Sequence, residues 1–239
     1  MTSSVHGRLI ELGARHDLSA DAATKFHALL DLVASEPAAI TSVRDPPEGV
    51  DMHIADSLVA LDLDVVREAV RIVDLGSGAG FPGLALAIAR PEAHVALIES
   101  VARKCAFLER AVRTLALDNV TVVPVRAEAW RDGLGINDVV TARALAPLGV
   151  VLEYAAPLLV MGGTLVAWKG RLEPTEEADA QAAAMALGMA APASSAVTPF
   201  EGARDRRLYS SSKVAPTPAQ FPRREGMARK RPLQASTRR

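Results

Sequence analysis

The spacing of apolar residues predicts helices in the first part of the chain. Between positions 23 and 33 apolar side chains recur three or four residues apart, which is the helical period: Ala23, Phe26, Leu29, Leu30 and Val33. Asp45-Pro46-Pro47 then breaks the pattern, and a second helical stretch follows from His53 to Leu63. Because this part lacks β-rich runs, we expect residues 1–70 to form a helical cap packed on the rest of the chain.

After residue 70 short apolar runs alternate with helical segments. The runs are mostly β-branched and lie at Arg71–Leu75, Val95–Ile98, Val120–Val125, Asp138–Ala142 and Thr164–Ala167. Such runs are typical of strands buried on both faces of a parallel sheet. The helical segments lie at Pro82–Arg90, Val101–Leu115, Leu145–Leu159 and Thr175–Leu187. The alternation predicts an α/β fold, a doubly wound and mostly parallel sheet over residues 71–215, with a polar strand near Arg207–Val214 closing its edge.

Composition narrows the class of protein. Hydrophobic residues make up 49% of the 239 positions, so the chain can bury a core and wholesale disorder is excluded. The single cysteine, Cys105, excludes a disulfide framework and Cys-rich zinc sites, and it fits a reducing cytosol. The five histidines show no metal-ligand spacing, and we expect no metal. Without a signal peptide or an apolar run long enough for a membrane span, we expect a soluble cytoplasmic protein.

The net charge of −1 hides an asymmetry between the body and the C-terminus. From Phe221 onward seven basic residues face one acid, which gives this segment a charge of +6 and the remainder −7. We treat residues 216–239 as a basic tail. Five of its cations are candidates for contacts with a polyanion such as RNA: Arg223, Arg224, Arg229, Lys230 and Arg231. The alternative is a solvated, frayed terminus.

The densest chemical signal is a glycine-rich turn directly after the first predicted strand. Residues 72–83 read IVDLGSGAGFPG, with four glycines at Gly76, Gly78, Gly80 and Gly83. Glycine lets the backbone approach a ligand closely, so we expect a ligand at this turn. The segment from Gly78 to Gly83 also satisfies the dinucleotide fingerprint G-x-G-x-x-G. A P-loop is excluded, because Leu84 follows where Lys and Ser or Thr are required.

The residue that favours one ligand over another is Asp74, two positions before Gly76. We expect its carboxylate to face the ligand, where it would repel a pyrophosphate and attract a cation. The ammonium and sulfonium groups of S-adenosylmethionine (AdoMet) are such cations. The pattern D-x-G-x-G-x-G therefore favours an AdoMet site over an NAD site.

Further candidate contacts end the strands that follow. Glu99 lies on the order of 20 residues past the turn, where an acid commonly accepts hydrogen bonds from ribose hydroxyls. Capping of the next helix is the alternative role for Glu99. Ala127-Glu128 and Arg143 end two later strands, and ligands of open α/β sheets bind at this edge. Arg143 either pairs with Asp74 or Glu128, or donates to guanine O6 and to phosphates.

Several motifs together resemble a known family. They are Thr41-Ser42-Val43-Arg44-Asp45, His53-Ile54-Ala55-Asp56-Ser57-Leu58, the glycine turn through Gly83, Lys104-Cys105-Ala106-Phe107-Leu108, Arg143-Ala144, Lys169-Gly170, Pro222-Arg223-Arg224 and Lys230-Arg231-Pro232-Leu233. At these residues the chain, from about Ile40 to Leu233, resembles the bacterial small-subunit ribosomal RNA guanine-N7 methyltransferases (RsmG, also called GidB). It departs from the usual family pattern at Ala39, Met52, Glu225 and Ala228.

The resemblance implies a class I methyltransferase, which is a Rossmann-like fold with a seven-stranded sheet. It implies methyl transfer from AdoMet to N7 of a guanine in the 530 loop of 16S rRNA (position 527 in ribosomal numbering), with the 30S subunit as partner. By similarity, Gly76, Phe81, Ala127, Glu128 and Arg143 occupy cofactor-contact positions. The departures concern RNA contacts more than the cofactor pocket, so another RNA target is an alternative.

The chemistry of this acceptor suits what the sequence lacks. N7 of guanine carries an in-plane lone pair and no proton, so its methylation needs placement and no general base. We expect Arg143→Ala to keep the fold and lose most methyl transfer, and we expect deletion of the tail to weaken RNA binding alone. Two other functions stay open: an NAD-dependent oxidoreductase, and a non-catalytic RNA-binding or ribosome-assembly module.

Overall fold

The computed structural model describes residues 4–235; positions 1–3 and 236–239, with Arg238 and Arg239 of the tail, lie outside the described residues. Seven strands form one sheet in the order β3-β2-β1-β4-β5-β7-β6. Their bounds are β1 (Arg71–Leu75), β2 (His94–Ile98), β3 (Val120–Val123), β4 (Asn137–Arg143), β5 (Leu159–Lys169), β6 (Ala193–Ala196) and β7 (Arg207–Ser212). Strands β1 to β5 are parallel and β7 is antiparallel to both neighbours, which confirms the predicted fold class.

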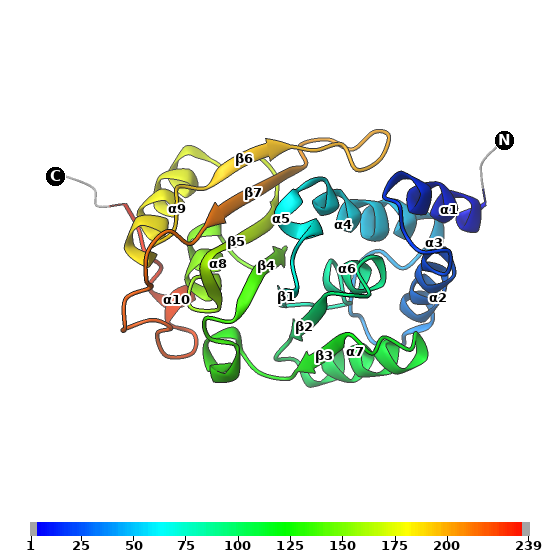
Figure 1. The fold of residues 1–239 in the computed structure, drawn as a ribbon, viewed down its shortest axis with the longest axis horizontal. Coiled ribbons are helices and arrows are strands. Elements are labelled where there is room, and N and C mark those ends of the chain that lie inside the picture. The colour runs from blue at the N-terminus through cyan, green and yellow to red at the C-terminus, as the bar shows by residue number, and fades with distance from the viewer. Residues whose placement is uncertain (1–3, 236–239) are drawn as a thin grey trace.

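Helices cover both faces of this sheet. They are α1 (Val5–Arg15), α2 (Ala22–Ser35), α3 (Pro46–Gly49), α4 (Asp56–Leu58), α5 (Asp64–Arg67), α6 (Gly83–Ala89), α7 (Ala102–Thr114), α8 (Leu148–Ala155), α9 (Pro174–Leu187) and α10 (Met227–Lys230). Figure 1 shows α1 to α7 on one side of the sheet and α8 to α10 on the other. The sheet is therefore doubly wound, as the alternation of strands and helices predicts.

The side chains of β1 show how the two faces are filled. Because successive residues of a strand point to opposite faces, Ile72 packs with the cap and α6 while Val73 packs with α8 and α9. Both side chains are fully buried. The sheet thus separates two hydrophobic clusters, and its central strands have no solvent-facing side.

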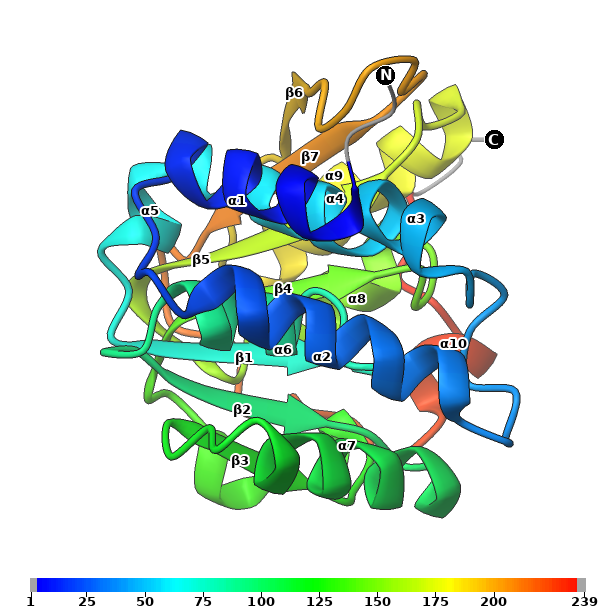
Figure 2. The ribbon, with the colours of Figure 1, turned by 90° about the vertical axis from the view of Figure 1, so that its right-hand side faces the viewer.

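The N-terminal helices share one of these clusters with the sheet. Leu9 of α1 and Phe26 of α2 are buried together with Leu84 and Leu86 of α6. Figure 2 shows α1 and α2 lying across this face of the sheet. The predicted helix at 53–63 is a change of helix type along one path, from a π-helix (Val50–Ala55) through α4 to a 3₁₀ helix (Val59–Asp62).

Two expectations about the sheet edge and its helices are wrong. Strand β7 does not close the edge, because β6 pairs with its outer side. The sequence Ala193-Ser194-Ser195-Ala196 gives no strand signal, since all four residues are exposed and pair on one side only. The predicted helix at Leu145–Leu159 is shorter and ends at Ala155, and Leu159 already begins β5.

The basic tail folds back onto the body as far as residue 235. Ala228 of α10 is buried, and Phe221 and Leu233 pack against the cluster formed by α8 and α9. Figure 2 shows α10 at the side to which the arrowheads of β1, β2 and β4 point. The described part of the tail is therefore a packed element beside the carboxyl ends of the strands and not a frayed extension.

The strand order fixes where a ligand is expected. From β1 the chain passes outward to β2 and β3, and it then returns to place β4 on the other side of β1. Open α/β sheets bind ligands at the carboxyl ends of the strands where the order reverses in this way. That point lies between the turn after Leu75 and the end of β4 at Arg143.

Candidate active site at the carboxyl edge of the sheet

The glycine turn after β1 is held in place by the neighbouring strand. The backbone N–H groups of Gly76 and Ser77 both donate to the carbonyl of Ile98, at 2.8 and 3.1 Å. Gly76, Gly78 and Gly80 have φ angles of +67°, +58° and +92°, in the region that favours glycine. A Cβ atom on Gly76 would lie 2.6 Å from a methyl carbon of Leu145. The turn therefore needs glycine both for its conformation and for its close approach to the loop after β4.

Asp74 is placed differently from the sequence-based expectation. Its carboxylate does not face a cavity but is fully buried beneath the turn. Oδ2 accepts a hydrogen bond from the N–H of Gly83 at 3.2 Å, and Oδ1 accepts one from the Thr141 hydroxyl at 2.9 Å. Asp74 thus ties the glycine turn to α6 and β4, and its charge reaches a ligand only through space.

Burial raises the pKa of Asp74 to about 6, although hydrogen bonds from Thr141 and Gly83 act in the opposite direction. Because the folded-state pKa lies above the unfolded value, the stability that this group contributes is greatest at low pH and falls as pH rises toward 6. Asn at this position can accept from Gly83 through its oxygen and donate from its amide to the Thr141 hydroxyl, which still donates to the carbonyl of Val73, and it carries no charge. Relative to wild type, Asp74→Asn should therefore gain stability between pH 4 and pH 7, by roughly 3 kcal/mol at most.

Urea unfolding of both proteins at several pH values measures this gain. A difference in unfolding free energy that stays constant from pH 4 to pH 7 would contradict the account of Asp74. Calorimetry adds a second readout at neutral pH, because only AdoMet, and not its product S-adenosylhomocysteine, carries a sulfonium charge. The variant should lose more affinity for AdoMet than for S-adenosylhomocysteine, if the buried charge acts on the sulfonium.

A cavity of about 380 Å³, here called the loop cavity, opens beside the turn. Its lining comes from the ends of β1 and β2, the turns after β3 and β4, helices α7 and α8, and the tail: Gly76, Glu99, Ser100, Lys104, Ala127, Glu128, Ala144, Leu145, Tyr154 and Arg229 among them. Four of the predicted cofactor contacts, Gly76, Glu99, Ala127 and Glu128, therefore meet at one cavity. Among the described residues that line it, the other predicted cofactor contacts Asp74, Gly78, Phe81 and Arg143 do not appear.

Glu99 is held by the backbone that leads into α7, and its ribose role stays a prediction. Its Oε1 accepts hydrogen bonds from the N–H groups of Ser100 and Val101, at 2.8 and 2.9 Å, which are the two residues just before the helix. Oε2 accepts one from Gly78 at 3.1 Å. A carboxylate has about four acceptor sites, so one site remains for a ligand hydroxyl. Cys105, by contrast, is a buried core residue whose thiol donates to the carbonyl of Glu99.

Glu128 connects the loop cavity to the tail. Its Oε1 accepts a hydrogen bond from the N–H of Gly226 at 2.9 Å. Arg229 lines the same cavity and donates to the carbonyl of Leu145 at 2.8 Å. Removing the tail would remove both contacts, so the expectation that its deletion affects RNA binding alone does not fit the structure.

The five tail cations differ in their availability. Arg223 donates through Nε to Glu153 at 2.6 Å and makes a second bond to the other oxygen of this carboxylate, whose side chain is only 2% exposed. These bonds raise the pKa of Arg223 and make it the counter-ion of a buried acid. Arg224, Lys230 and Arg231 are exposed and stay candidates for RNA contacts.

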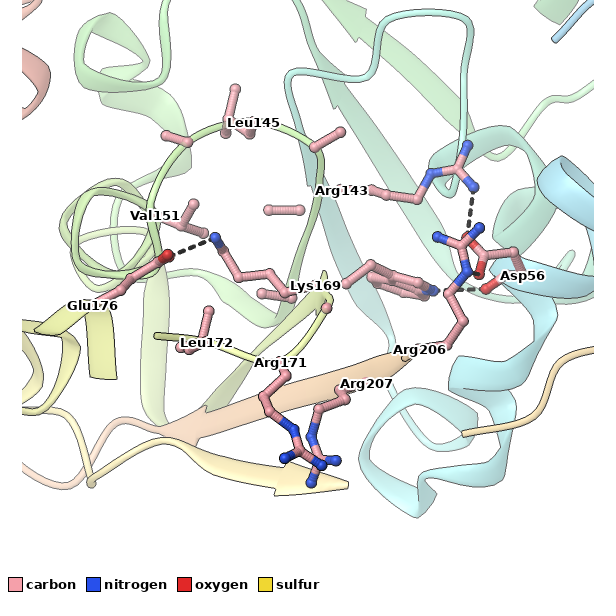
Figure 3. A pocket seen from close by; sticks show the side chains of 16 residues that line it. Asp56, Arg143, Leu145, Val151, Lys169, Arg171, Leu172, Glu176, Arg206 and Arg207 are labelled. Carbon is pink, nitrogen blue, oxygen red and sulfur yellow. Dashed lines mark hydrogen bonds and ion pairs between the residues drawn. The ribbon is translucent and has the colours of Figure 1, made fainter. Parts of the chain in front are cut away.

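A second cavity, of about 420 Å³, lies on the other side of Ala144 and Leu145 and is here called the arginine cavity. Its basic lining residues are Arg143, Lys169, Arg171, Arg206 and Arg207, and its acidic ones are Asp56 and Glu176 (Figure 3). Lys169 pairs with Glu176 at 2.6 Å. Arg171 is exposed and has no acidic partner among the described residues. Cations therefore outnumber acids around this opening.

Arg143 is paired, but with neither Asp74 nor Glu128. Its Nη1 donates to Oδ2 of Asp56 and to the carbonyl of Met52, both at 2.8 Å. Its Nη2 lies 3.4 Å from Nδ1 of His53, and the Phe81 ring is stacked on His53 with centroids 4.3 Å apart. The cap thus supplies the partners that hold the arginine at the end of β4.

His53 acts as a neutral hydrogen-bonding residue in this arrangement. Burial is the main cause that lowers its pKa. Its Nε2 lies 3.0 Å from the carbonyl of Val43, which can only accept, so Nε2 carries the proton and Nδ1 is free to accept from Arg143. A structural role for His53, at the junction of the cap and the site, follows from these contacts.

Comparison with known proteins decides what kind of site this is. The model of the family rRNA small subunit methyltransferase G matches residues 21–205. Ribosomal RNA small subunit methyltransferase G of Roseiflexus castenholzii is 45% identical over 199 residues, covering 81% of this chain and 83% of the relative. The protein of the same name from Desulfitobacterium hafniense is 35% identical over 232 residues, covering 95% and 96%. The chain belongs to the rRNA small subunit methyltransferase G family.

Solved structures agree with the methyltransferase fold of this family member. The apo structure of the S-adenosylmethionine-dependent methyltransferase SibL aligns with a TM-score of 0.57 at 13% identity, covering 88% of this chain and 74% of SibL. Fibrillarin from Aeropyrum pernix, solved with bound S-adenosyl-L-methionine, aligns with a TM-score of 0.50 at 17% identity, covering 66% and 72%. The resemblance stated from the sequence motifs is confirmed, and the NAD-dependent oxidoreductase is set aside.

Sequence reasoning did not assign several residues that this family member brings to the arginine cavity. Asp56 and Lys169 lie in motifs that carried the resemblance, but no role was derived for them. Arg171 lies two residues after the end of β5, and Arg207 begins β7. Since β7 runs antiparallel to β5, its first residue reaches the edge at which β5 ends. A basic residue just after one strand and another at the start of the next antiparallel strand is the sequence signal that could have identified these two arginines.

Two further observations concern the residues from 4 to 235. No helix there is both long and apolar enough to cross a membrane. No group of three or more His, Cys, Asp or Glu side chains in the same range gathers closely enough to hold a metal ion.

Proposed function

We propose that the protein transfers a methyl group from AdoMet to N7 of a guanine in the 530 loop of 16S rRNA, acting on the 30S subunit in the cytoplasm. Family membership supports the reaction class and the RNA substrate. The observation that carries the proposal is the pair of adjoining cavities, which share Ala144 and Leu145 as a wall. One cavity suits the cofactor and the other suits the nucleotide.

The residues of the loop cavity fit AdoMet. When bound, AdoMet supplies a methyl group on a positively charged sulfur. Gly76 leaves room for it, since a Cβ there would close the gap to Leu145. Glu99 has one acceptor site left for a ribose hydroxyl, and the backbone at Ala127 and Glu128 lines the next part of the cavity. Gly78 and Asp74 hold the glycine turn from beneath the cavity. The negative charge of Asp74 also acts through space on the sulfonium of AdoMet.

The arginine cavity fits a base that needs orientation and no deprotonation. N7 of guanine attacks with its own lone pair, so the chain has to place the base and exclude water. The Arg143 guanidinium has five N–H donors. The two on Nη1 are in use, and one on Nη2 lies near Nδ1 of His53. We assign the remaining donors of Arg143 to O6 of the base, which leaves N7 free for attack.

The arginines at the opening suit the RNA backbone. Arg171 and Arg207 both line the arginine cavity, and Figure 3 shows both side chains pointing to the same side of it. The Nε of Arg207 donates to the Ser194 hydroxyl, which leaves its terminal nitrogens available. Planar guanidinium groups bind phosphate through paired hydrogen bonds. We therefore assign these two residues, with Arg224, Lys230 and Arg231 of the tail, to contacts with RNA phosphates.

Replacing both Arg171 and Arg207 with alanine should reduce RNA affinity about tenfold or more. It should also make the plot of log affinity against log salt concentration less steep by nearly two, because each lost phosphate contact removes a little less than one from the slope. Filter binding to 16S rRNA at several salt concentrations between about 50 and 200 mM measures both quantities. Arg113→Ala is the control, because this exposed arginine ends α7 on the opposite edge of the sheet. Equal salt slopes in the double variant and the control would remove these residues from the RNA site.

Transfer of tritium from methyl-labelled AdoMet tests the proposed function. The acceptors are 30S subunits from cells that lack this modification, naked 16S rRNA and 50S subunits. We expect label in a small-subunit acceptor and none in the 50S subunits. Binding of AdoMet without transfer to any small-subunit acceptor would instead support the non-catalytic RNA-binding or ribosome-assembly module.

A further inference from the structure

One atom of the arginine cavity stands out because it is buried without a hydrogen bond. Asp56 is 3% exposed, and its Oδ1 is one of two buried side-chain polar atoms among residues 4–235 that have no hydrogen-bond partner. Its other oxygen, Oδ2, receives the bond from Arg143. Buried acceptors are almost always paired, so an unpaired one at a cavity wall indicates a place for a ligand donor.

The position of Asp56 is well fixed. The Trp168 indole N–H donates to the Asp56 backbone carbonyl at 2.6 Å, which ties α4 to β5. Arg206 lies over the free oxygen, with Nε 3.7 Å away, beyond hydrogen-bond distance. The Arg206 side chain is 36% exposed, and besides Asp56 its only other polar side-chain contact among residues 4–235 is a weak one to Met52 Sδ at 3.5 Å. It can therefore move toward an RNA phosphate and leave Oδ1 to an incoming base.

We propose that Asp56 recognises the target guanine, with Oδ1 accepting a hydrogen bond from the 2-amino group on the Watson–Crick edge of the base. This inference rests on the proposed function, which supplies guanine as the acceptor. Guanine carries two adjacent donors on that edge, N1–H and the 2-amino group. Adenine and cytosine pair their amino group with a ring-nitrogen acceptor, and uracil has a single donor between two carbonyl groups. A carboxylate thus complements guanine better than the other three RNA bases.

The direction of the base agrees with the placement of the two cavities. N7 lies on the edge of the purine that faces away from N1 and the 2-amino group. Asp56 and Arg206 form one side of the arginine cavity, whereas Ala144 and Leu145 form the wall shared with the loop cavity. A guanine that meets Asp56 with its Watson–Crick edge turns N7 away from the cap and toward that shared wall. Recognition would use the 2-amino side of the base, and methyl transfer would use N7 on the other side.

The test compares two reconstituted 30S subunits that differ at the target nucleotide alone, which is guanine in one and inosine in the other. Inosine keeps N7, O6 and N1–H but lacks the 2-amino group. For the wild-type protein we expect kcat/KM to fall about tenfold or more on inosine, since a site built to bond a donor rejects the analogue without it. For Asp56→Ala we expect a lower kcat/KM on both and a guanine-to-inosine ratio near one. Asp56→Asn should also lower the ratio toward one, because its single acceptor oxygen pairs with Arg143, which can only donate, and its amide group, which cannot accept, then faces the base.

The ratio separates recognition from the support that Asp56 gives to Arg143. If Asp56 only positions Arg143, Asp56→Ala lowers both rates and leaves the ratio at its wild-type value, which overturns the proposal. A wild-type ratio near one overturns it as well. If Asp56→Ala does not fold, Asp56→Asn alone decides, and an unchanged ratio in that variant counts against the proposal. Absence of transfer to the guanine substrate overturns the proposed function and this inference with it, whereas equal transfer to both substrates removes Asp56 alone.

Discussion

Replacing Gly76 with alanine is expected to weaken AdoMet binding about tenfold or more, which corresponds to roughly 1.4 kcal/mol. The reason is space. The new Cβ would lie 2.6 Å from Leu145 Cδ1, and Leu145 lines the loop cavity, so either the Cβ or the displaced Leu145 intrudes where the cofactor binds. Calorimetric titration with AdoMet measures the loss directly.

Gly135→Ala is a matched control for this change. Gly135 has nearly the same φ angle as Gly76, +66° against +67°, and a Cβ there would meet nothing within 4 Å. It lies just before β4, at the edge of the sheet opposite the loop cavity. The left-handed backbone should cost each variant about 1–2 kcal/mol of stability, but only Gly76→Ala meets Leu145 and should lose AdoMet affinity. Equal affinities in the two variants would show that the turn does not hold the cofactor.

Replacing Arg143 with alanine is expected to lower the unfolding free energy by about 3 kcal/mol, because the buried Asp56 carboxylate loses its hydrogen-bonded partner and keeps only Arg206, 3.7 Å away. This revises the sequence-based expectation that the variant simply keeps its fold. Adding Asp56→Asn should restore most of the stability, since the uncompensated charge is removed. Methyl transfer should stay low in the double variant, because the donors assigned to guanine O6 are still missing.

The exposed ion pair between Arg67 and Asp64 is the control for this double-mutant cycle. Its side chains are 55% and 74% exposed, so Arg67→Ala should cost less than about 1 kcal/mol. Urea unfolding and tritium transfer measured on the same samples separate the two roles of Arg143. Wild-type transfer rates in Arg143→Ala, or rates restored in the double variant, would exclude this arginine from the reaction.

The sequence predicted the parts of the fold that are set by local pattern. Buried parallel strands read as apolar β-branched runs, and β1 and β2 were found within a residue of their ends because both faces of these strands need such side chains. Strand β6 was missed because its residues Ala193–Ala196 are small, exposed and paired on one side. Strand β6 forms because it pairs with β7, and no pattern within residues 193–196 indicates that pairing.

The site was predictable in location but not in orientation. The glycine turn and the strand ends identified the correct edge of the sheet. Asp74 was expected to face the ligand, but Thr141 and Gly83 turn its carboxylate inward, and Thr141 lies 67 residues away along the chain. Likewise the partner of Arg143 is Asp56 in the cap, 87 residues earlier. Contacts of this kind follow from packing and not from spacing along the chain.

The most direct test of the account is the position of the new methyl group. After reaction with 30S subunits that lack the modification, borohydride reduction and aniline treatment cleave RNA at N7-methylguanine, and primer extension locates the break. The account predicts one new cleavage, at a guanine in the 530 loop of 16S rRNA, that depends on both the enzyme and AdoMet. Label incorporated without cleavage there, or cleavage at a different base, would contradict it.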